Sequence, residues 1–80
     1  MSDVRTQIQT IIAEVLDQPD LVLTPGMTAH DIEGWDSLAH ISLMFSIESH
    51  FGVTFSDTEM AQFERVDDLI ELVQTKTGQT

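Results

Sequence analysis

The stretch Gly34-Trp35-Asp36-Ser37-Leu38 marks the point where a long irregular segment ends and an apolar helical pattern begins. Over residues 37–51 apolar side chains recur at helical spacing, and Gly52, a residue common just past a helix end, follows them. Residues 17–36 lack this periodicity and are punctuated by Pro19, Pro25, Gly26 and Gly34. The sequence therefore predicts a helix that begins at Ser37 and is entered from a long loop.

Three further helices are expected on either side of this one. A stripe of aliphatic residues over 4–16 stops before Pro19, and a second stripe covers 66–76. Ser56 and Glu59 have the spacing of a capping box, which predicts a short helix that ends near Phe63. The sequence thus predicts an all-α fold, with residues 1–80 forming one domain: a small four-helix bundle of three longer helices and one short helix.

The connections before and after the second helix are predicted to differ. The loop over 17–36 exceeds the usual length of a connection, but it contains apolar residues that can hold it in order against the helices: Leu21, Val22, Leu23, Met27 and Ile32. Phe51, Val53 and Phe55 alternate as in a strand, but no other strand pattern is available to pair with them. This segment is therefore interpreted as an extended connector.

Charge and cysteine content narrow the possible partners and compartment. Fourteen carboxylates against three Lys and Arg residues give a net charge of -11, which repels nucleic acid and anionic lipid. Basic protein surfaces are the expected partners. The chain has no cysteine, no signal peptide pattern and no long apolar run. We therefore expect a cytoplasmic monomer that does not insert into membranes.

The position of Ser37 suggests a chemistry for its hydroxyl. Backbone N–H groups without helical partners and the positive end of the helix dipole lie at a helix N-terminus, where a phosphate attached to serine is favoured. From the local sequence alone, the alternative is that Asp36 or Ser37 serves only as the N-cap of the helix.

The same residues resemble a known attachment site. Gly34-Trp35-Asp36-Ser37-Leu38, after a long loop and opening an apolar helix, is similar to the phosphopantetheine attachment site of acyl carrier proteins, and the likeness in helix order extends over nearly the whole chain. It implies that a phosphopantetheinyl transferase moves 4'-phosphopantetheine from coenzyme A to Ser37, with Asp36 and Leu38 as its neighbours in the site. The arm would then carry an acyl, aminoacyl or polyketide-type group as a thioester, and the chain would be a carrier and no enzyme.

The resemblance also implies a surface for enzymes that load and process the acyl group. Leu38, Ile41 and Phe45 are expected on an exposed face of the second helix, with Trp35 packed beside the attachment point. By the same likeness, Leu43, Ile47 and Phe51 should point inward. The carboxylates expected to steer basic partner surfaces are Asp31, Glu33, Asp36 and Glu48.

The chain departs from housekeeping fatty-acid carriers at three positions. Ala39 and Ser42 stand where those carriers usually have acids, and Trp35 stands where they commonly have a small residue. These departures resemble specialised stand-alone carriers of secondary-metabolite, polyketide-like or aminoacyl-transfer pathways.

Other functions were weighed against the carrier. An unmodified acidic adaptor that binds basic proteins through the second helix is the main alternative. Ser37 and His40 lie three residues apart and could share a helix face as nucleophile and base, but the sequence marks no orienting group or oxyanion hole. His30, His40 and His50 lack metal-ligand spacing, and the acidic run 31–36 has a misplaced glycine for a calcium loop. No metal site is therefore predicted.

Overall fold

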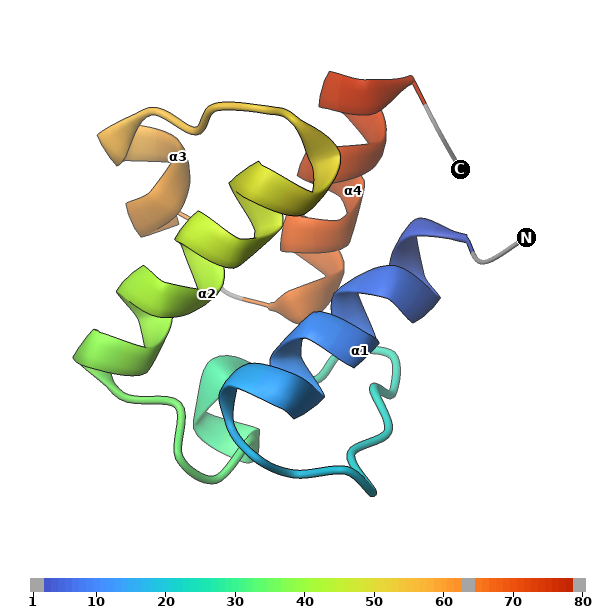
Figure 1. Cartoon of the computed structure of the whole chain (residues 1–80), viewed down its shortest axis with the longest axis vertical. Coiled ribbons are helices and arrows are strands. Elements are labelled where there is room, and N and C mark those ends of the chain that lie inside the picture. Colours follow the sequence, from blue (N-terminus) through green and yellow to red (C-terminus); the bar gives the residue numbers. More distant parts are fainter. Residues whose placement is uncertain (1–2, 63–64, 79–80) are drawn as a thin grey trace.

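The computed structural model describes residues 3–62 and 65–78, and they form a bundle of four α-helices. The helices are α1 (Val4–Val15), α2 (Ser37–Phe51), α3 (Asp57–Gln62) and α4 (Val66–Thr77), and a single turn of 3-10 helix, η1 (Ala29–Asp31), lies in the loop between α1 and α2. Figure 1 shows α2 running diagonally across the molecule, with α1 and α4 on one side of it and the short α3 on the other. The predicted all-α bundle is confirmed.

Helix α1 begins where an aspartate satisfies its first turn. The Asp3 carboxylate accepts a hydrogen bond from the Thr6 N–H at 2.8 Å, and this bond is the main cause of a lowered pKa at Asp3. The buried face of α1, made by Val4, Ile8, Ile11 and Ile12, packs between α2 and α4.

Helix α2 starts and stops as its sequence predicts. The Asp36 carboxylate accepts a hydrogen bond from the Ala39 N–H at 2.8 Å, which makes Asp36 the N-cap. At the other end Gly52 adopts a left-handed conformation (φ 68°), and its N–H bonds the Glu48 carbonyl. Leu43, Met44 and Ile47 on the inner face of α2 are buried, which adds them to the core.

The core contains only apolar side chains among the residues described. The α4 stripe contributes Val66, Leu69, Ile70 and Val73, all of them buried, as the spacing in the sequence predicted. No charged or polar residue of the described ranges is buried. Apolar burial therefore supplies the main stabilising term of the bundle.

The loop over 17–36 is ordered, as expected, because it is fixed at several points. Leu23 and Ile32 are buried, and the Leu23 N–H donates to the Gln9 side chain of α1 at 2.8 Å. Thr28 pairs with Arg65 in an isolated antiparallel bridge. The inclusion of Val22 among the anchoring residues was wrong: it is 63% exposed, because its side chain projects away from the core that its two neighbours enter.

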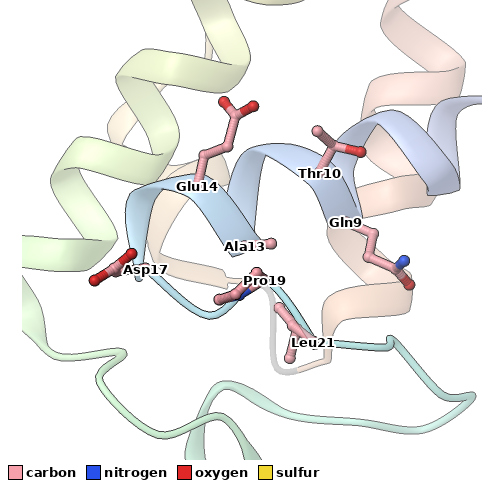
Figure 2. A pocket seen from close by; sticks show the side chains of 7 residues that line it. All are labelled: Gln9, Thr10, Ala13, Glu14, Asp17, Pro19 and Leu21. Carbon is pink, nitrogen blue, oxygen red and sulfur yellow. The ribbon is translucent and has the colours of Figure 1, made fainter.

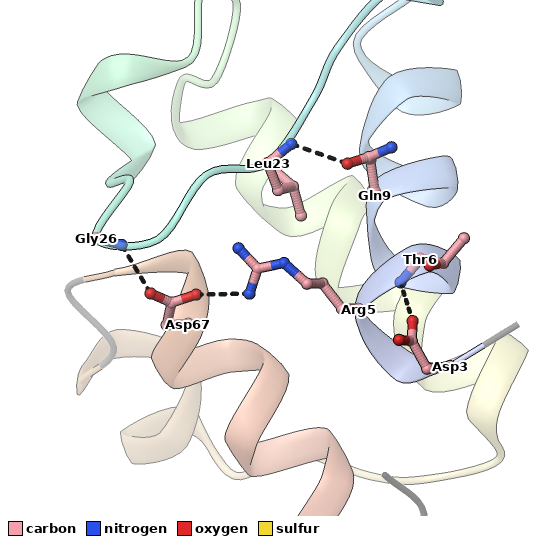
Figure 3. A network of polar contacts seen from close by, with 7 residues as sticks. All are labelled: Asp3, Arg5, Thr6, Gln9, Leu23, Gly26 and Asp67. Carbon is pink, nitrogen blue, oxygen red and sulfur yellow. Dashed lines mark hydrogen bonds and ion pairs between the residues drawn. The ribbon is translucent and has the colours of Figure 1, made fainter.

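An ion pair and a hydrogen bond on one carboxylate join three distant segments (Figure 3). Asp67, in the first turn of α4, accepts from Arg5 of α1 at 3.0 Å and from the Gly26 N–H of the loop at 2.8 Å. The Gly26 N–H, and next the Arg5 guanidinium, lower the pKa of Asp67. Because Arg5 and Asp67 are each more than a third exposed, the network is expected to fix geometry more than to add stability.

The segment between α2 and α3 is an extended connector, as predicted. The Glu48 carboxylate of α2 accepts a hydrogen bond from the Phe55 N–H at 2.8 Å, which holds the connector against the helix. The predicted capping box is present, because Ser56 and Glu59 exchange hydrogen bonds at 2.9 and 3.1 Å. Lys76 of α4 pairs with Glu59 at 3.1 Å. Phe63, where the third helix was expected to end, lies outside the described residues.

Within residues 3–62 and 65–78, the helices are too short or too polar to cross a lipid bilayer.

Candidate functional site

Ser37 is the first residue of α2, and its side chain is exposed. Figure 1 places this end of α2 on the side of the molecule away from both chain termini. Because the Asp36 carboxylate caps the helix, the Ser37 hydroxyl is not needed for that role. The cap and the candidate attachment residue are therefore two neighbouring side chains with separate tasks.

The surroundings of Ser37 suit a negatively charged phosphodiester. In α-helix geometry the Ser37 and Leu38 N–H groups have no partner within the helix, and the positive end of the α2 dipole lies beside the hydroxyl. Two of the chain's three Lys and Arg residues, Arg5 and Lys76, form ion pairs with Asp67 and Glu59. The backbone of α2 is therefore the main source of positive potential that we assign to the site.

An exposed apolar face runs along α2 from Ser37. Leu38 is 77% exposed, Ile41 54% and Phe45 66%, and their spacing places them along the Ser37 side of the helix. Phe51 packs against the core with partial burial, and Leu43 and Ile47 are fully buried. The predicted separation of an inner and an outer face is thus observed. Three large apolar side chains exposed on one side of a helix indicate an interaction site.

Trp35 is held beside Ser37 by hydrogen bonds that the sequence did not predict. Its indole Nε1 donates to His40 Nδ1 at 3.3 Å, and His40 Nε2 lies 3.1 Å from the Met60 carbonyl of α3. Because an indole N–H can only donate, Nδ1 must be the unprotonated nitrogen and Nε2–H donates to Met60. His40 therefore links the loop, α2 and α3, and neither of its ring nitrogens is directed to Ser37 as a general base.

The acids predicted to steer partners also have local structural roles. The Asp31 carboxylate accepts from the Thr28 N–H and hydroxyl at 2.9 and 3.2 Å, where it caps η1. The Glu48 carboxylate accepts the hydrogen bond from the Phe55 N–H. Glu33 is exposed, and its backbone carbonyl accepts a hydrogen bond from the Gln18 side chain. Recognition of partners by these carboxylates stays a prediction.

Two surface depressions differ in their relation to Ser37. One, of about 630 Å³, is lined by Ser37 together with Ala29, His30, Trp35, Asp36, His40 and Ile41. The other, of about 480 Å³, lies between α1 and the residues that follow it, and Figure 2 shows the side chains of Glu14 and Asp17 at its edge. Its lining includes neither Ser37 nor a cation, so the first depression is the relevant one. Within the described ranges no group of His, Asp or Glu side chains is arranged to hold a metal ion.

An exposed serine at the start of an apolar helix in a four-helix bundle is the arrangement that a carrier domain needs, because a carrier holds its group on a covalent arm. The sequence matches the family described as phosphopantetheine attachment site over residues 6–73. The chain therefore belongs to this family, and 4'-phosphopantetheine is its cofactor.

Curated relatives and a solved structure agree with this assignment. An acyl carrier protein of Solidesulfovibrio magneticus is 30% identical over 95% of this chain and 97% of its own length. Acyl carrier protein 3 of Ralstonia nicotianae is 31% identical over 85% of this chain and 78% of its own length. The solution NMR structure of a holo acyl carrier protein from Geobacter metallireducens is 35% identical, has a TM-score of 0.86, and is matched over 98% of this chain and 88% of its own. Proteins of this kind are carriers and work with phosphopantetheinyl transferases and acyl-processing enzymes.

Proposed function

We propose that the chain is an acyl carrier in which the Ser37 hydroxyl bears the phosphopantetheine arm. The observation that carries the proposal is the exposed Ser37 at the N-terminus of α2, with capping assigned to Asp36. The family match covers this position. The match to the phosphopantetheine attachment family, which the unmodified adaptor does not account for, favours the carrier.

Attachment makes one bond and breaks one. The Ser37 Oγ bonds to the phosphorus of the 4'-phosphate of coenzyme A, the pyrophosphate P–O bond breaks, and adenosine 3',5'-bisphosphate leaves. The hydroxyl proton goes to a base of the transferase, because the His40 nitrogens face Trp35 and Met60. The product phosphodiester lies at the positive end of α2.

The bound arm supplies a thiol, which this cysteine-free chain lacks, for a thioester with the acyl group. The chain itself fixes the origin of the arm and presents a surface that other enzymes recognise. We propose no catalytic role for it, since an exposed hydroxyl on an open surface excludes no water.

The surface offered to partner enzymes has an apolar part and an acidic part. Between Ser37 and Glu48 the α2 sequence contains no Asp, Glu, Lys or Arg, and its exposed side is apolar at Leu38, Ile41 and Phe45. Of the acids expected to steer partners, Asp31, Glu33 and Asp36 lie at the loop end, and Glu48 lies near the other end of α2. We therefore propose partners that combine an apolar patch for α2 with basic residues opposite the loop.

The neutral face of α2 also supports a specialised pathway, such as acyl, aminoacyl or polyketide-type transfer in secondary metabolism. The working unit is proposed to be one monomeric carrier domain over residues 1–80, located in the cytoplasm where coenzyme A is available as arm donor.

Intact-protein mass spectrometry tests the attachment. Wild type and Ser37→Ala are incubated with coenzyme A, magnesium and a broad-specificity phosphopantetheinyl transferase, after the starting mass shows an unmodified chain. Wild type should gain one phosphopantetheine and Ser37→Ala none. If Ser37→Ala gains the same mass, the arm is on another residue. If the folded wild type gains nothing with several transferases, the adaptor becomes the better explanation.

A further inference from the structure

The depression beside Ser37 has the composition expected for an apolar group close to the attachment point. Ser37 itself forms part of its wall, and Ala29, Trp35 and Ile41 contribute apolar surface, with His30 and His40 as the polar members next to Asp36. Ile41 is 54% exposed, so part of its side chain is available to a ligand. The depression is open to solvent, so an arm attached at Ser37 can enter it from the solvent side.

The indole wall of the depression is fixed in place before any ligand arrives. Trp35 packs against the core with partial burial, and its ring nitrogen is bonded to His40, whose other nitrogen bonds Met60 of α3. The centroids of the Trp35 and His40 rings lie 6.2 Å apart, and the angle between the ring planes is 34°. A side chain that is already ordered loses little conformational entropy on binding, so this wall is preorganised for contact with a ligand.

The chemical groups along the arm match the residues that line the depression. Its phosphate attaches to the serine oxygen, its gem-dimethyl carbon follows a few bonds later, and a hydroxyl and two amides come next. The only branched apolar group of the arm is thus tethered close to Ser37, where Trp35 and Ile41 offer apolar surface. His30, which also lines the depression, can hydrogen-bond with the polar groups that follow.

We propose that this depression receives the proximal half of the phosphopantetheine arm, with the gem-dimethyl group against the Trp35 indole and His40 as the residue that positions the indole. The inference rests on the proposed attachment at Ser37. It gives the tryptophan before Asp36 a role in holding the arm at the surface, from which a partner enzyme can lift it.

Proton NMR of the modified protein tests the proposal directly. The gem-dimethyl signals should move upfield from their positions in free pantetheine because of the indole ring current, and they should show nuclear Overhauser effects to Trp35 and Ile41. Trp35 is the only tryptophan of the chain, so its indole N–H signal and fluorescence give independent readings. Both should change between the unmodified and modified forms.

Three variants make the assignment specific. Trp35→Leu should return the gem-dimethyl signals to their free positions, and Ile41→Ala, on an exposed residue, should weaken the contacts with little risk to folding. Phe45→Ala is the matched control, since Phe45 is also exposed on α2 (66%, against 54% for Ile41) but does not line the depression. Circular dichroism checks that each variant is folded.

The two proposals fail in different ways. A wild-type chain whose mass shows one arm, but whose gem-dimethyl signals stay at their free positions, overturns arm docking and leaves attachment intact. The same conclusion follows if Trp35→Leu and Phe45→Ala give identical spectra. A chain that gains no mass overturns the attachment and the docking together.

Discussion

Replacing Asp36 by alanine separates the capping of α2 from the chemistry of Ser37. The Asp36 carboxylate bonds the Ala39 N–H at 2.8 Å, and Asp36 is the N-cap of α2. Loss of an N-cap of this kind costs about 1 kcal/mol, within a range of about 0.5–2 kcal/mol. For a domain of this size the melting temperature should fall by about 4–8 °C per kcal/mol lost. Ser37→Ala removes an exposed hydroxyl with no capping role, and should change the free energy of unfolding by less than about 0.5 kcal/mol.

The assay is thermal unfolding at neutral pH, followed by circular dichroism on unmodified protein. Asp36→Asn is the matched control, because asparagine caps helices about as well as aspartate but carries no charge. It should keep most of the stability that Asp36→Ala loses. Any effect of Asp36→Asn on the rate of arm transfer is then due to loss of the negative charge of Asp36. If Ser37→Ala lowers the melting temperature as much as Asp36→Ala, Ser37 shares the capping role and the reasoning from the structure is refuted.

Two further predictions concern the core and acid stability. Ile47→Ala, at a fully buried position, should cost about 2–5 kcal/mol in urea unfolding, whereas Phe45→Ala, at 66% exposure, should cost much less; equal losses would contradict the two-faced description of α2. Backbone N–H donors are the largest cause of the lowered pKa of Asp3, Glu59 and Asp67. A carboxylate whose pKa is lower in the folded than in the unfolded protein stabilises the fold at pH values above its unfolded pKa. This stabilisation is lost as the pH falls through the folded pKa. The gap in melting temperature between wild type and Asp67→Asn should therefore narrow from about pH 6 to about pH 3. A gap that widens toward acid would show that the sign is wrong.

Much of the fold was predictable because it depends on residues close together in the chain. Helix faces follow from three- and four-residue spacing, and the capping box of Ser56 and Glu59 and the stop at Gly52 involve contacts within one turn. The same local logic placed Ser37 at a helix N-terminus. Its role as attachment residue came from the resemblance and stays a prediction until mass is measured.

Contacts between distant segments were not predictable from one sequence. Nothing in the spacing of Trp35, His40 and Met60 indicates that a histidine connects an indole to a carbonyl twenty residues further on. The hydrogen bond from the Phe55 N–H to the Glu48 carboxylate was missed for a related reason. A glutamate in the last turns of a helix has the pattern of a solvated surface charge, and the sequence does not show that the following connector folds back against it. Val22 was assigned to the core because loop residues have no periodicity that separates inward from outward.

The sequence by itself determined where α1, α2 and α4 begin and end, which stripes are apolar, and that a serine opens the second helix, because those properties depend on backbone geometry over one or two turns. Periodicity alone does not decide which apolar residues of α2 remain uncovered, because α2 is apolar on both faces. The resemblance predicted the outer set, and the packing of the other face against α1 and the core confirms it. Only the tertiary structure decided that Trp35 is fixed beside Ser37 and that Asp67 joins α1 to the loop. Those contacts exist only after loop closure has brought segments far apart in the chain together.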